Sequence, residues 1–111
     1  MLNIKRGSLV YTLFPNQENN GFSVKLCIIL DTERNCAYFV PCTTKTGQEW
    51  RYVKHFEIKK DSPEGIKMKL KEDSMVIVDR FDPLPYSIIK HQHDGLVPDS
   101  ILKKIEDLLE E

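Results

Sequence analysis

The stretch VKLCIILDTERNCAYFVPC, residues 24–42, contains two apolar runs with a short polar connection between them. The first run, residues 24–30, is nearly continuously apolar, which is typical of a strand buried on both faces. The connection at residues 31–35 has the composition of a turn, and residues 36–42 return as a further strand. Two such runs joined so closely predict an antiparallel meander.

The same β pattern continues on both sides of this pair. Residues 8–14, SLVYTLF, are rich in strand-forming residues and end at Pro15. Residues 50–58 alternate loosely between apolar and polar side chains, which predicts a strand with one face in solvent. The later strands are expected at residues 74–78 and, as a short edge strand, at residues 86–90. The composition predicts loops at residues 16–21 and 59–65, and a bend at Pro83 and Pro85.

The end of the chain has a helical period. Its apolar residues form one stripe, which consists of Ile101, Leu102, Ile105, Leu108 and Leu109. Pro98 suits the first helical position, and Asp99 suits the positive end of the helix dipole. With 111 residues the chain is expected to form a single domain, residues 1–111. The sequence therefore predicts a mainly β fold, a small barrel-like sheet of five to seven short strands closed by a C-terminal helix.

The chain is almost balanced in charge. It carries 16 Lys and Arg against 17 Asp and Glu, so any site for a polyanion has to be a local patch. Residues 44–72 carry eight Lys and Arg against five acidic residues, whereas residues 94–111 carry two Lys against six acidic residues. A basic middle and an acidic end are consistent with one face for a polyanion, and equally with an ordinary solvated surface.

The three cysteines, Cys27, Cys36 and Cys42, are odd in number, and no two of them have the CxxC spacing. This argues against a disulfide framework or a zinc site and favours a reducing compartment. The first residues do not resemble a signal peptide, and no apolar run approaches the roughly 18 residues that span a bilayer. We therefore expect a cytoplasmic protein without membrane association.

The end of the strand at residues 36–42 is the first candidate site, because it runs into Thr43, Thr44 and Lys45. By local pattern alone this is a strand that enters a turn, but a threonine at a strand end can also direct its hydroxyl at a phosphate. Cleavage of RNA requires removal of the 2′-OH proton, stabilisation of charge on the phosphorane and protonation of the leaving 5′-oxygen. The cations nearby in sequence that can stabilise this charge are Lys25, Lys45 and Arg51.

The histidines are weaker candidates. His55 lies in WRYVKHF, residues 50–56, where aromatic residues alternate with cations, a pattern useful for stacking bases and neutralising phosphates. Its side chain titrates near physiological pH, so it can act as an acid or base, although a surface histidine is the simpler reading. His91 and His93 supply only two ligands, fewer than a metal site requires. Neither a metal nor another cofactor is expected.

Asp79 and Arg80 follow the apolar run at residues 74–78. A carboxylate at a strand end can hold an arginine or act as a base. It can equally cap the loop that follows.

Five motifs follow one another along nearly the whole chain: IKRGSLVY, VKLCIIL, VPCTTK, DSMVIVDRF and GLVPDSILKKIEDLL. Their order and spacing resemble the MazF/PemK/Kid toxins of bacterial toxin–antitoxin systems. The resemblance implies an SH3-like β-barrel with a C-terminal helix, usually a homodimer. It also implies a metal-independent endoribonuclease that cuts single-stranded RNA at short sequences and leaves a cyclic phosphate. Finally, it implies an antitoxin protein whose disordered acidic tail binds over the substrate groove.

The resemblance also assigns roles to individual residues. The strand-end threonine of the family falls on Thr43, and Thr44 takes the small polar position after it. The family's aspartate after the late strand falls on Asp79, and Arg80 stands where the family has glutamine. The family opens its second strand with Arg-Pro, whose arginine is the main catalytic group, but here the pair is Lys25-Leu26. Lysine keeps the charge without the planar fork that grips a phosphate through two hydrogen bonds.

Three outcomes of this exchange stay open. Lys25 performs a weaker version of the catalytic role, or Arg51 or Arg80 supplies the guanidinium, or the fold only binds nucleic acid or a protein. In the first hypothesis the chain is a toxin with Lys25, Thr43 and Asp79 as catalytic residues. The substrate-binding residues of that hypothesis are Thr44, Lys45, Arg51, His55 and Arg80. An unrelated SH3-like module is a further alternative, with a groove for proline-rich peptides lined by Tyr11, Tyr38, Trp50 and Tyr52.

Overall fold

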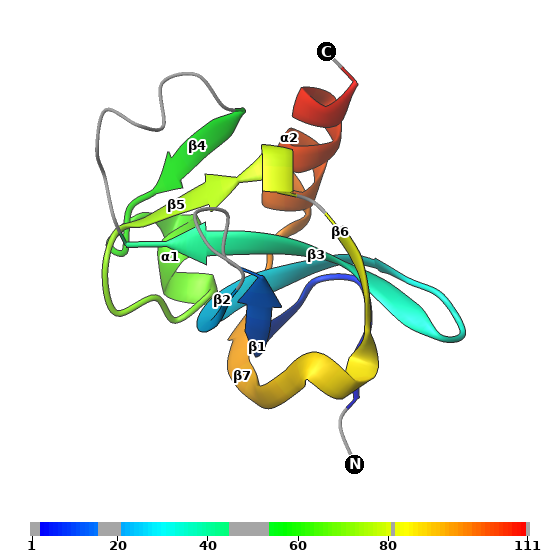
Figure 1. Cartoon of the computed structure of the whole chain (residues 1–111). Helices are drawn as coiled ribbons and strands as arrows, with labels where there is room; N and C mark the ends of the chain where they lie inside the picture. Colours follow the sequence, from blue (N-terminus) through cyan, green and yellow to red (C-terminus); the bar gives the residue numbers. More distant parts are fainter. Residues whose placement is uncertain (1–2, 16–20, 45–53, 81, 111) are drawn as a thin grey trace.

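The computed structural model describes residues 3–15, 21–44, 54–80 and 82–110, in which it has seven strands and two α-helices (Figure 1). The strands are β1 (Ser8–Pro15), β2 (Phe22–Thr32), β3 (Cys36–Thr43), β4 (His55–Ile58), β5 (Ser74–Ile77), β6 (Asp82–Pro85) and β7 (Ile89–Leu96). The helices are α1 (Pro63–Lys67) and α2 (Asp99–Leu109), and two 3₁₀ turns, η2 (Val78–Arg80) and η3 (Tyr86–Ile88), flank β6. The predicted mainly β fold with a C-terminal helix is confirmed. Within these ranges no helix has the length and apolar character needed to cross a membrane.

The seven strands form one antiparallel sheet. Six of them lie in the order β4-β5-β3-β2-β1-β7, and β6 pairs with β3. Since β2 occupies one edge of β3, the other edge is shared: residues 36–39 pair with β6, and residues 42–43 pair with β5. Among the described strands β4 pairs only with β5 and β7 only with β1, so the two ends of the sheet are not joined. The expected barrel is therefore an open sheet.

One stretch that was predicted as a loop contains a short helix. Helix α1 covers five residues within and just beyond the expected loop at residues 59–65. The hydroxyl of Ser62 accepts a hydrogen bond from the N–H of Gly65 at 3.0 Å, and Pro63 occupies the first turn. This helix is specified by its N-cap and its proline. With five residues, it is too short to show a helical period of apolar side chains.

Strand β7 is longer than the edge strand expected at residues 86–90. Residues 86–88 form η3, and the strand then runs through the polar stretch KHQHDGL to Leu96. The polar composition of this stretch gave no strand pattern. Such a composition is tolerated because β7 is an outer strand with exposed positions. The bend expected at Pro83 and Pro85 is strand β6. Of the strand expected at residues 50–58, residues 50–53 lie outside the described ranges.

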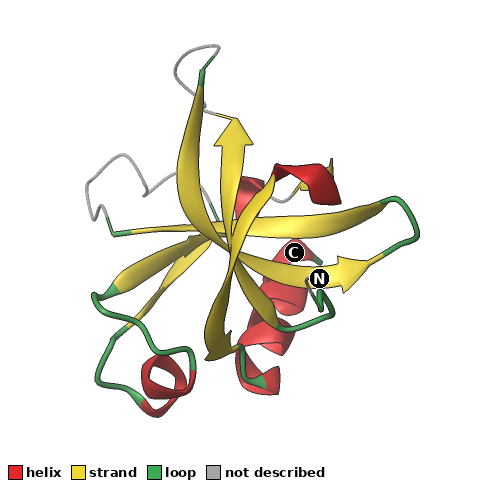
Figure 2. Cartoon of the chain, turned by 90° about the horizontal axis from the view of Figure 1, so that it is seen from below, coloured by secondary structure: helices red, strands yellow, loops and turns green. Residues whose placement is uncertain are grey.

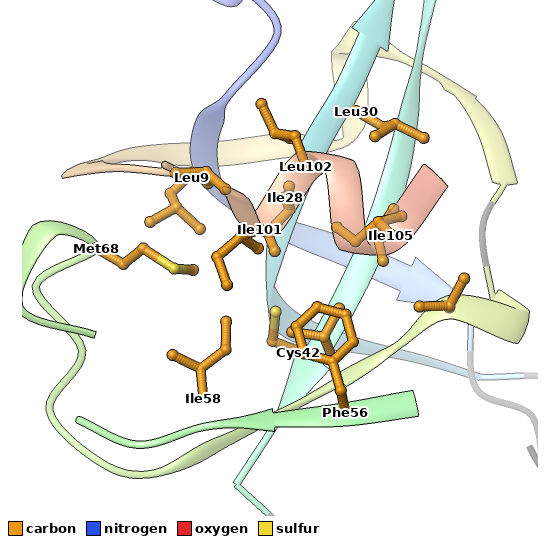
Figure 3. Close-up of a cluster of buried hydrophobic side chains, with 14 residues drawn as sticks. Leu9, Ile28, Leu30, Cys42, Phe56, Ile58, Met68, Ile101, Leu102 and Ile105 are labelled. Carbon is orange, nitrogen blue, oxygen red and sulfur yellow. The ribbon is translucent and has the colours of Figure 1, made fainter. Parts of the chain in front are cut away.

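The two faces of the sheet carry separate clusters of buried side chains. Strand β2 contributes Ile28 to one and Cys27 and Ile29 to the other, as alternation along a strand requires. The helix-side cluster lies between the sheet and α2 (Figure 3) and includes Leu9, Ile28, Val40, Cys42, Phe56, Val76, Ile101, Leu102 and Ile105. The β6-side cluster includes Val10, Phe14, Cys27, Ile29, Phe39 and Ile89. Residues 27–30 of β2 are buried as predicted, whereas Val24, at the start of the predicted run, is exposed. Of the predicted helical stripe, Ile101, Leu102 and Ile105 are buried, and Leu109 is exposed.

Candidate functional site

Strands β2 and β3 part at one end of the sheet. Their last cross-strand pair is Leu26 with Cys42. Beyond it, β2 stays paired with β1 as far as Phe22, whereas β3 stays paired with β5 through Thr43 and Met75. Figure 2 shows two paired strands that leave the rest of the sheet in a clearly different direction. The sheet is therefore split at this end.

A hollow of about 440 Å³ lies at this split. Strand β2 lines it with residues 23–26, and the end of β3 lines it with Cys42 and Thr43, followed by Thr44. Three of the predicted site residues, Lys25, Thr43 and Thr44, are thus brought together. They contribute one ammonium group and two hydroxyl groups to the same site.

The other wall of the hollow was not predicted. It is formed by residues 69–72, which follow α1, together with Tyr11 of β1 and His93 of β7. The described lining therefore contains three lysines and one acidic residue, namely Lys25, Lys69, Lys71 and Glu72. The sequence showed the surplus of positive charge in residues 44–72. It did not show that α1 returns the chain to the split between β2 and β3.

A close contact between Met68 and Gly95 holds this wall in place. The side chain of Met68 is fully buried in the helix-side cluster. A Cβ atom on Gly95 would lie 2.0 Å from the carbonyl oxygen of Met68, so only glycine allows β7 to approach here. His93 precedes Gly95 by two positions and Lys69 follows Met68 directly. The contact therefore brings His93 and Lys69 to the same side of the hollow.

His93 is held as a neutral imidazole at neutral pH. Its Nδ1 accepts a hydrogen bond of 2.8 Å from the N–H of Gly95, which assigns the ring proton to Nε2. Partial burial is the main cause that lowers the pKa of His93 below its ordinary value. The negative charge of Asp94 opposes this shift, and the positive charges of Lys69 and Lys71 and the neighbouring His91 add to it. His93 therefore offers an N–H donor.

The two histidines of β7 lie against an aromatic ring. The ring centroid of Tyr11 is 6.1 Å from that of His91 and 5.7 Å from that of His93. In the described part of the chain, no group of three or more His, Cys, Asp or Glu side chains gathers as a set of metal ligands. The two imidazole rings lie next to the ring of Tyr11, which lines the hollow.

Asp79 and His55 lie at a different place. Oδ2 of Asp79 accepts a hydrogen bond of 2.8 Å from the N–H of Lys54, and His55 begins β4 opposite Ile77. Neither Asp79 nor His55 lines the hollow. His55 is two strands across and two residues along from Thr43, a Cα separation of roughly 12 Å. The contact of Asp79 caps the backbone just before β4, 25 residues earlier in the chain, whereas the sequence had suggested a cap for the loop after Asp79.

The remaining predicted residues lie wholly or partly outside the described ranges. This holds for Lys45 and Arg51, and also for the aromatic residues Trp50 and Tyr52. The backbone of Arg80 ends η2, and its side chain is not described. Of the other two aromatics expected in a peptide groove, Tyr11 lines the hollow, and the hydroxyl of Tyr38 lies 3.2 Å from a carboxylate oxygen of Glu33 at the turn between β2 and β3.

The thiols are protonated at neutral pH. Burial raises the pKa of Cys27 to about 12, although the Thr12 hydroxyl and the charge of Lys25 oppose this shift. Burial also raises the pKa of Cys42. The pKa of Cys36 is raised chiefly by its hydrogen bond with Glu33. Cys42 therefore contributes a neutral, weakly polar group to the lining of the hollow.

The hollow combines groups that suit an oxyanion. Ammonium groups supply charge, hydroxyls and the N–H of His93 supply hydrogen bonds, and this set matches a phosphate. No protein-family model matches the chain, and no curated protein matches it either. The resemblance to the MazF/PemK/Kid toxins therefore rests on the order and spacing of the five motifs.

Proposed function

We propose that this chain is a MazF/PemK-like toxin that cleaves single-stranded RNA at the split between β2 and β3. One observation carries the proposal: Lys25 and Thr43 lie on the two sides of that split and line the same hollow. These are the residues to which the resemblance assigns charge stabilisation and phosphate binding. The cationic lining of the hollow supports a polyanionic substrate.

In the proposed reaction the ribose 2′-oxygen attacks the adjacent phosphorus, and the 5′-oxygen of the next nucleotide leaves. The 2′-hydroxyl gives its proton to a base, and the leaving oxygen takes a proton from an acid. The products are a 2′,3′-cyclic phosphate and a 5′-hydroxyl. The nucleophile belongs to the substrate, so the reaction requires no metal ion. Lys25 stabilises the charge that develops on the phosphorane, and Thr43 donates a hydrogen bond to a phosphate oxygen.

The other predicted residues act around this centre. Thr44 binds the same strand of RNA in the hollow, and His55 binds it beyond the hollow, where β4 begins. Lys45, Arg51 and Arg80 are assigned to the RNA backbone. Asp79 is a positioning residue, because its contact with the N–H of Lys54 fixes the residue before His55.

The proposed toxin acts in the cytoplasm as a homodimer. Its partner is an antitoxin protein with an acidic tail. Such a tail competes with RNA because both are polyanions, and the lysines of the hollow attract either one.

A second candidate function is binding of RNA without cleavage. One observation favours it: His93, the one imidazole in the described lining of the hollow, has its Nδ1 engaged by Gly95 and so offers a donor instead of a base. The exchange of Arg-Pro for Lys25-Leu26 points the same way, because a lysine grips a phosphate less firmly.

The deciding experiment incubates the pure protein with a long single-stranded RNA in EDTA and resolves the products on a gel. Lys25→Ala and Thr43→Ala are compared with Lys67→Ala, an exposed lysine at the end of α1 that does not line the hollow. Discrete fragments with cyclic phosphate ends, lost in the first two variants and retained in the third, support the toxin. Intact RNA that still shifts on a native gel supports binding alone, and an unchanged rate in Lys25→Ala removes the role given to Lys25.

A further inference from the structure

Lys69 has a backbone conformation that lysine rarely adopts. Its φ is +53°, and no other residue with a Cβ has a positive φ in the described ranges. It stands directly after Met68, the C-cap of α1, where the N–H of Lys69 bonds the carbonyl of Ile66 and the N–H of Leu70 bonds that of Gly65. Helices favour glycine at this position, since a Cβ is strained there. The presence of a lysine at this strained position indicates a role for its side chain.

The neighbouring residues alternate between the core and the hollow. Leu70 packs against the helix-side cluster, and Lys69 and Lys71 on either side of it are exposed. Both lysines line the hollow opposite residues 23–26 of β2. The left-handed turn at Lys69 and the partly buried Leu70 thus set two ammonium groups on one wall.

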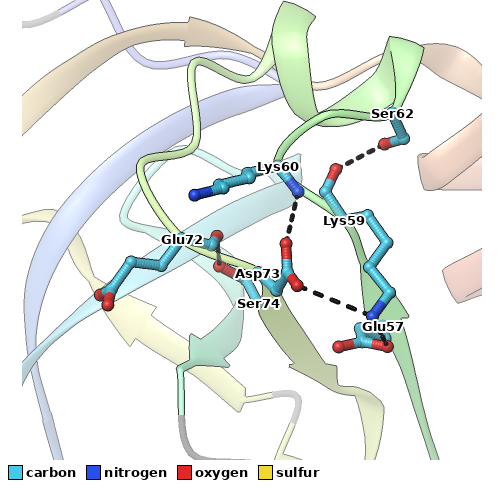
Figure 4. Close-up of polar contacts among 7 residues, drawn as sticks. All are labelled: Glu57, Lys59, Lys60, Ser62, Glu72, Asp73 and Ser74. Atoms are coloured by element: carbon cyan, nitrogen blue, oxygen red, sulfur yellow. Dashed lines mark hydrogen bonds and ion pairs between the residues drawn. The ribbon is translucent and has the colours of Figure 1, made fainter.

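Among the described residues, the lysines of this wall form no ion pair, although Glu72 lines the same hollow. Lys59 illustrates the contrast, because its Nζ lies 3.2 Å from Oε1 of Glu57 and 3.6 Å from Oδ2 of Asp73 (Figure 4). Within the described ranges no ion pair is formed by the three lysines of the hollow, Lys25, Lys69 and Lys71. Unpaired cations gathered around a hollow attract an anion, since each like charge raises the local positive potential.

His93 completes the wall with a neutral donor. Gly95 holds its Nδ1, so the N–H of its Nε2 remains for a ligand. Lys69, Lys71 and His93 all line the same hollow. Two ammonium groups and one N–H donor are a suitable set for the oxygens of one phosphate group.

We propose that Lys69, Lys71 and His93 form a second phosphate site, which binds the phosphate of the single strand next to the one held by Lys25 and Thr43. This inference rests on the proposed function, because it takes the same strand of RNA as the ligand. The hollow of about 440 Å³ is far larger than one phosphate group, and cations line two of its walls. The strand therefore crosses the hollow from the split to the segment after α1.

The test uses a short strand of 2′-O-methyl RNA, which lacks the 2′-hydroxyl and is not cleaved. Its dissociation constant is measured over a range of salt concentrations for the wild type, Lys69→Gly, Lys71→Ala and Lys67→Ala. Each lost phosphate contact reduces the slope of log K against log salt by about 0.7 and weakens binding about fivefold at about 0.1 M salt. We expect this change in Lys69→Gly and Lys71→Ala and not in Lys67→Ala.

Lys69→Gly also separates binding from folding. Glycine relieves the strain of the left-handed conformation, so the melting temperature should equal or exceed that of the wild type while binding weakens. A more stable Lys69→Gly with an unchanged salt slope overturns the inference. So does an equal loss of slope in Lys67→Ala, or a wild type that does not bind the strand. Failure of the proposed function gives a different result. Ordinary RNA then stays intact, while the salt slopes of Lys69→Gly and Lys71→Ala still change.

Discussion

Lys25 and Thr43 are the first residues of β2 and β3 beyond the last pair of these strands, Leu26 with Cys42. Because β2 follows β1 and β3 follows β5 from this point, the two residues flank a hollow. Had the ladder continued, they would have been ordinary cross-strand neighbours on a closed surface. The separation of the strands is what makes room for a ligand between them.

In the proposed ribonuclease, replacement of Lys25 with arginine should raise the rate of RNA cleavage. A guanidinium binds a phosphate through two parallel hydrogen bonds, which an ammonium does not. Loss of the charge in Lys25→Ala should lower the rate by about 100-fold or more, as for removal of one transition-state donor. Single-turnover cleavage of a labelled RNA measures both variants. A Lys25→Arg protein as slow as Lys25→Ala would contradict the role of Lys25.

Acid should destabilise the protein through His93. The folded state holds the pKa of His93 below the ordinary 6.5, so the unfolded chain binds this proton first as the pH falls. The loss of folding stability due to His93 is absent above about pH 6.5. It grows as the pH falls below that value and levels off below the pKa of His93 in the folded state. Between about pH 7.5 and about pH 5.5, the melting temperature of the wild type should therefore fall further than that of His93→Gln. Parallel curves for the two proteins would exclude this assignment.

Gly95→Ala should destabilise the fold by about 3 kcal/mol, because the new Cβ meets the carbonyl oxygen of Met68. The backbone of Met68 has to move, and the wall at residues 69–72 moves with it. Urea unfolding measures the loss of stability. Leu96→Ala is a matched control, since Leu96 follows Gly95 in β7 and its side chain is 62% exposed. Equal losses in the two variants would show that the contact with Met68 is not tight.

Asp79→Asn should keep both the stability and the cleavage rate, because the amide oxygen accepts the same hydrogen bond from the N–H of Lys54. Asp79→Ala should lose about 1 kcal/mol, the usual contribution of one hydrogen bond. Thermal unfolding and the cleavage assay report the two properties separately. If Asp79→Asn kept its stability but no longer cleaved RNA, Asp79 would have a catalytic role.

The sequence predicted those elements that have a long apolar run or a clear apolar period. Residues 24–30 and 36–42 lie within β2 and β3, and the stripe at Ile101, Leu102 and Ile105 faces the core. Helix α1 was missed because five residues hold no period, although Ser62 and Pro63 are typical of a helix start. Only the first two residues of β7 fell within the predicted edge strand at residues 86–90, because residues 90–94 are all polar.

The site was predicted on one side only. The order of the motifs placed Lys25 and Thr43 at strand ends, and the structure brings them to one hollow. The wall of Lys69, Lys71 and His93 depends on contacts between distant residues, above all Met68 with Gly95, which no local pattern reveals. His55 begins β4, and Asp79 lies in η2 directly after β5, so both belong to the part of the sheet beyond β3 and neither lines the hollow.

The two buried thiols lie on opposite sides of the sheet, Cys42 in the helix-side cluster and Cys27 in the β6-side cluster. The protein therefore carries an internal reporter in each layer of its core. A thiol reagent added in pulses during unfolding modifies each cysteine only when its own layer opens. Peptide mass analysis then gives the order in which the layers separate, without any substitution in the chain.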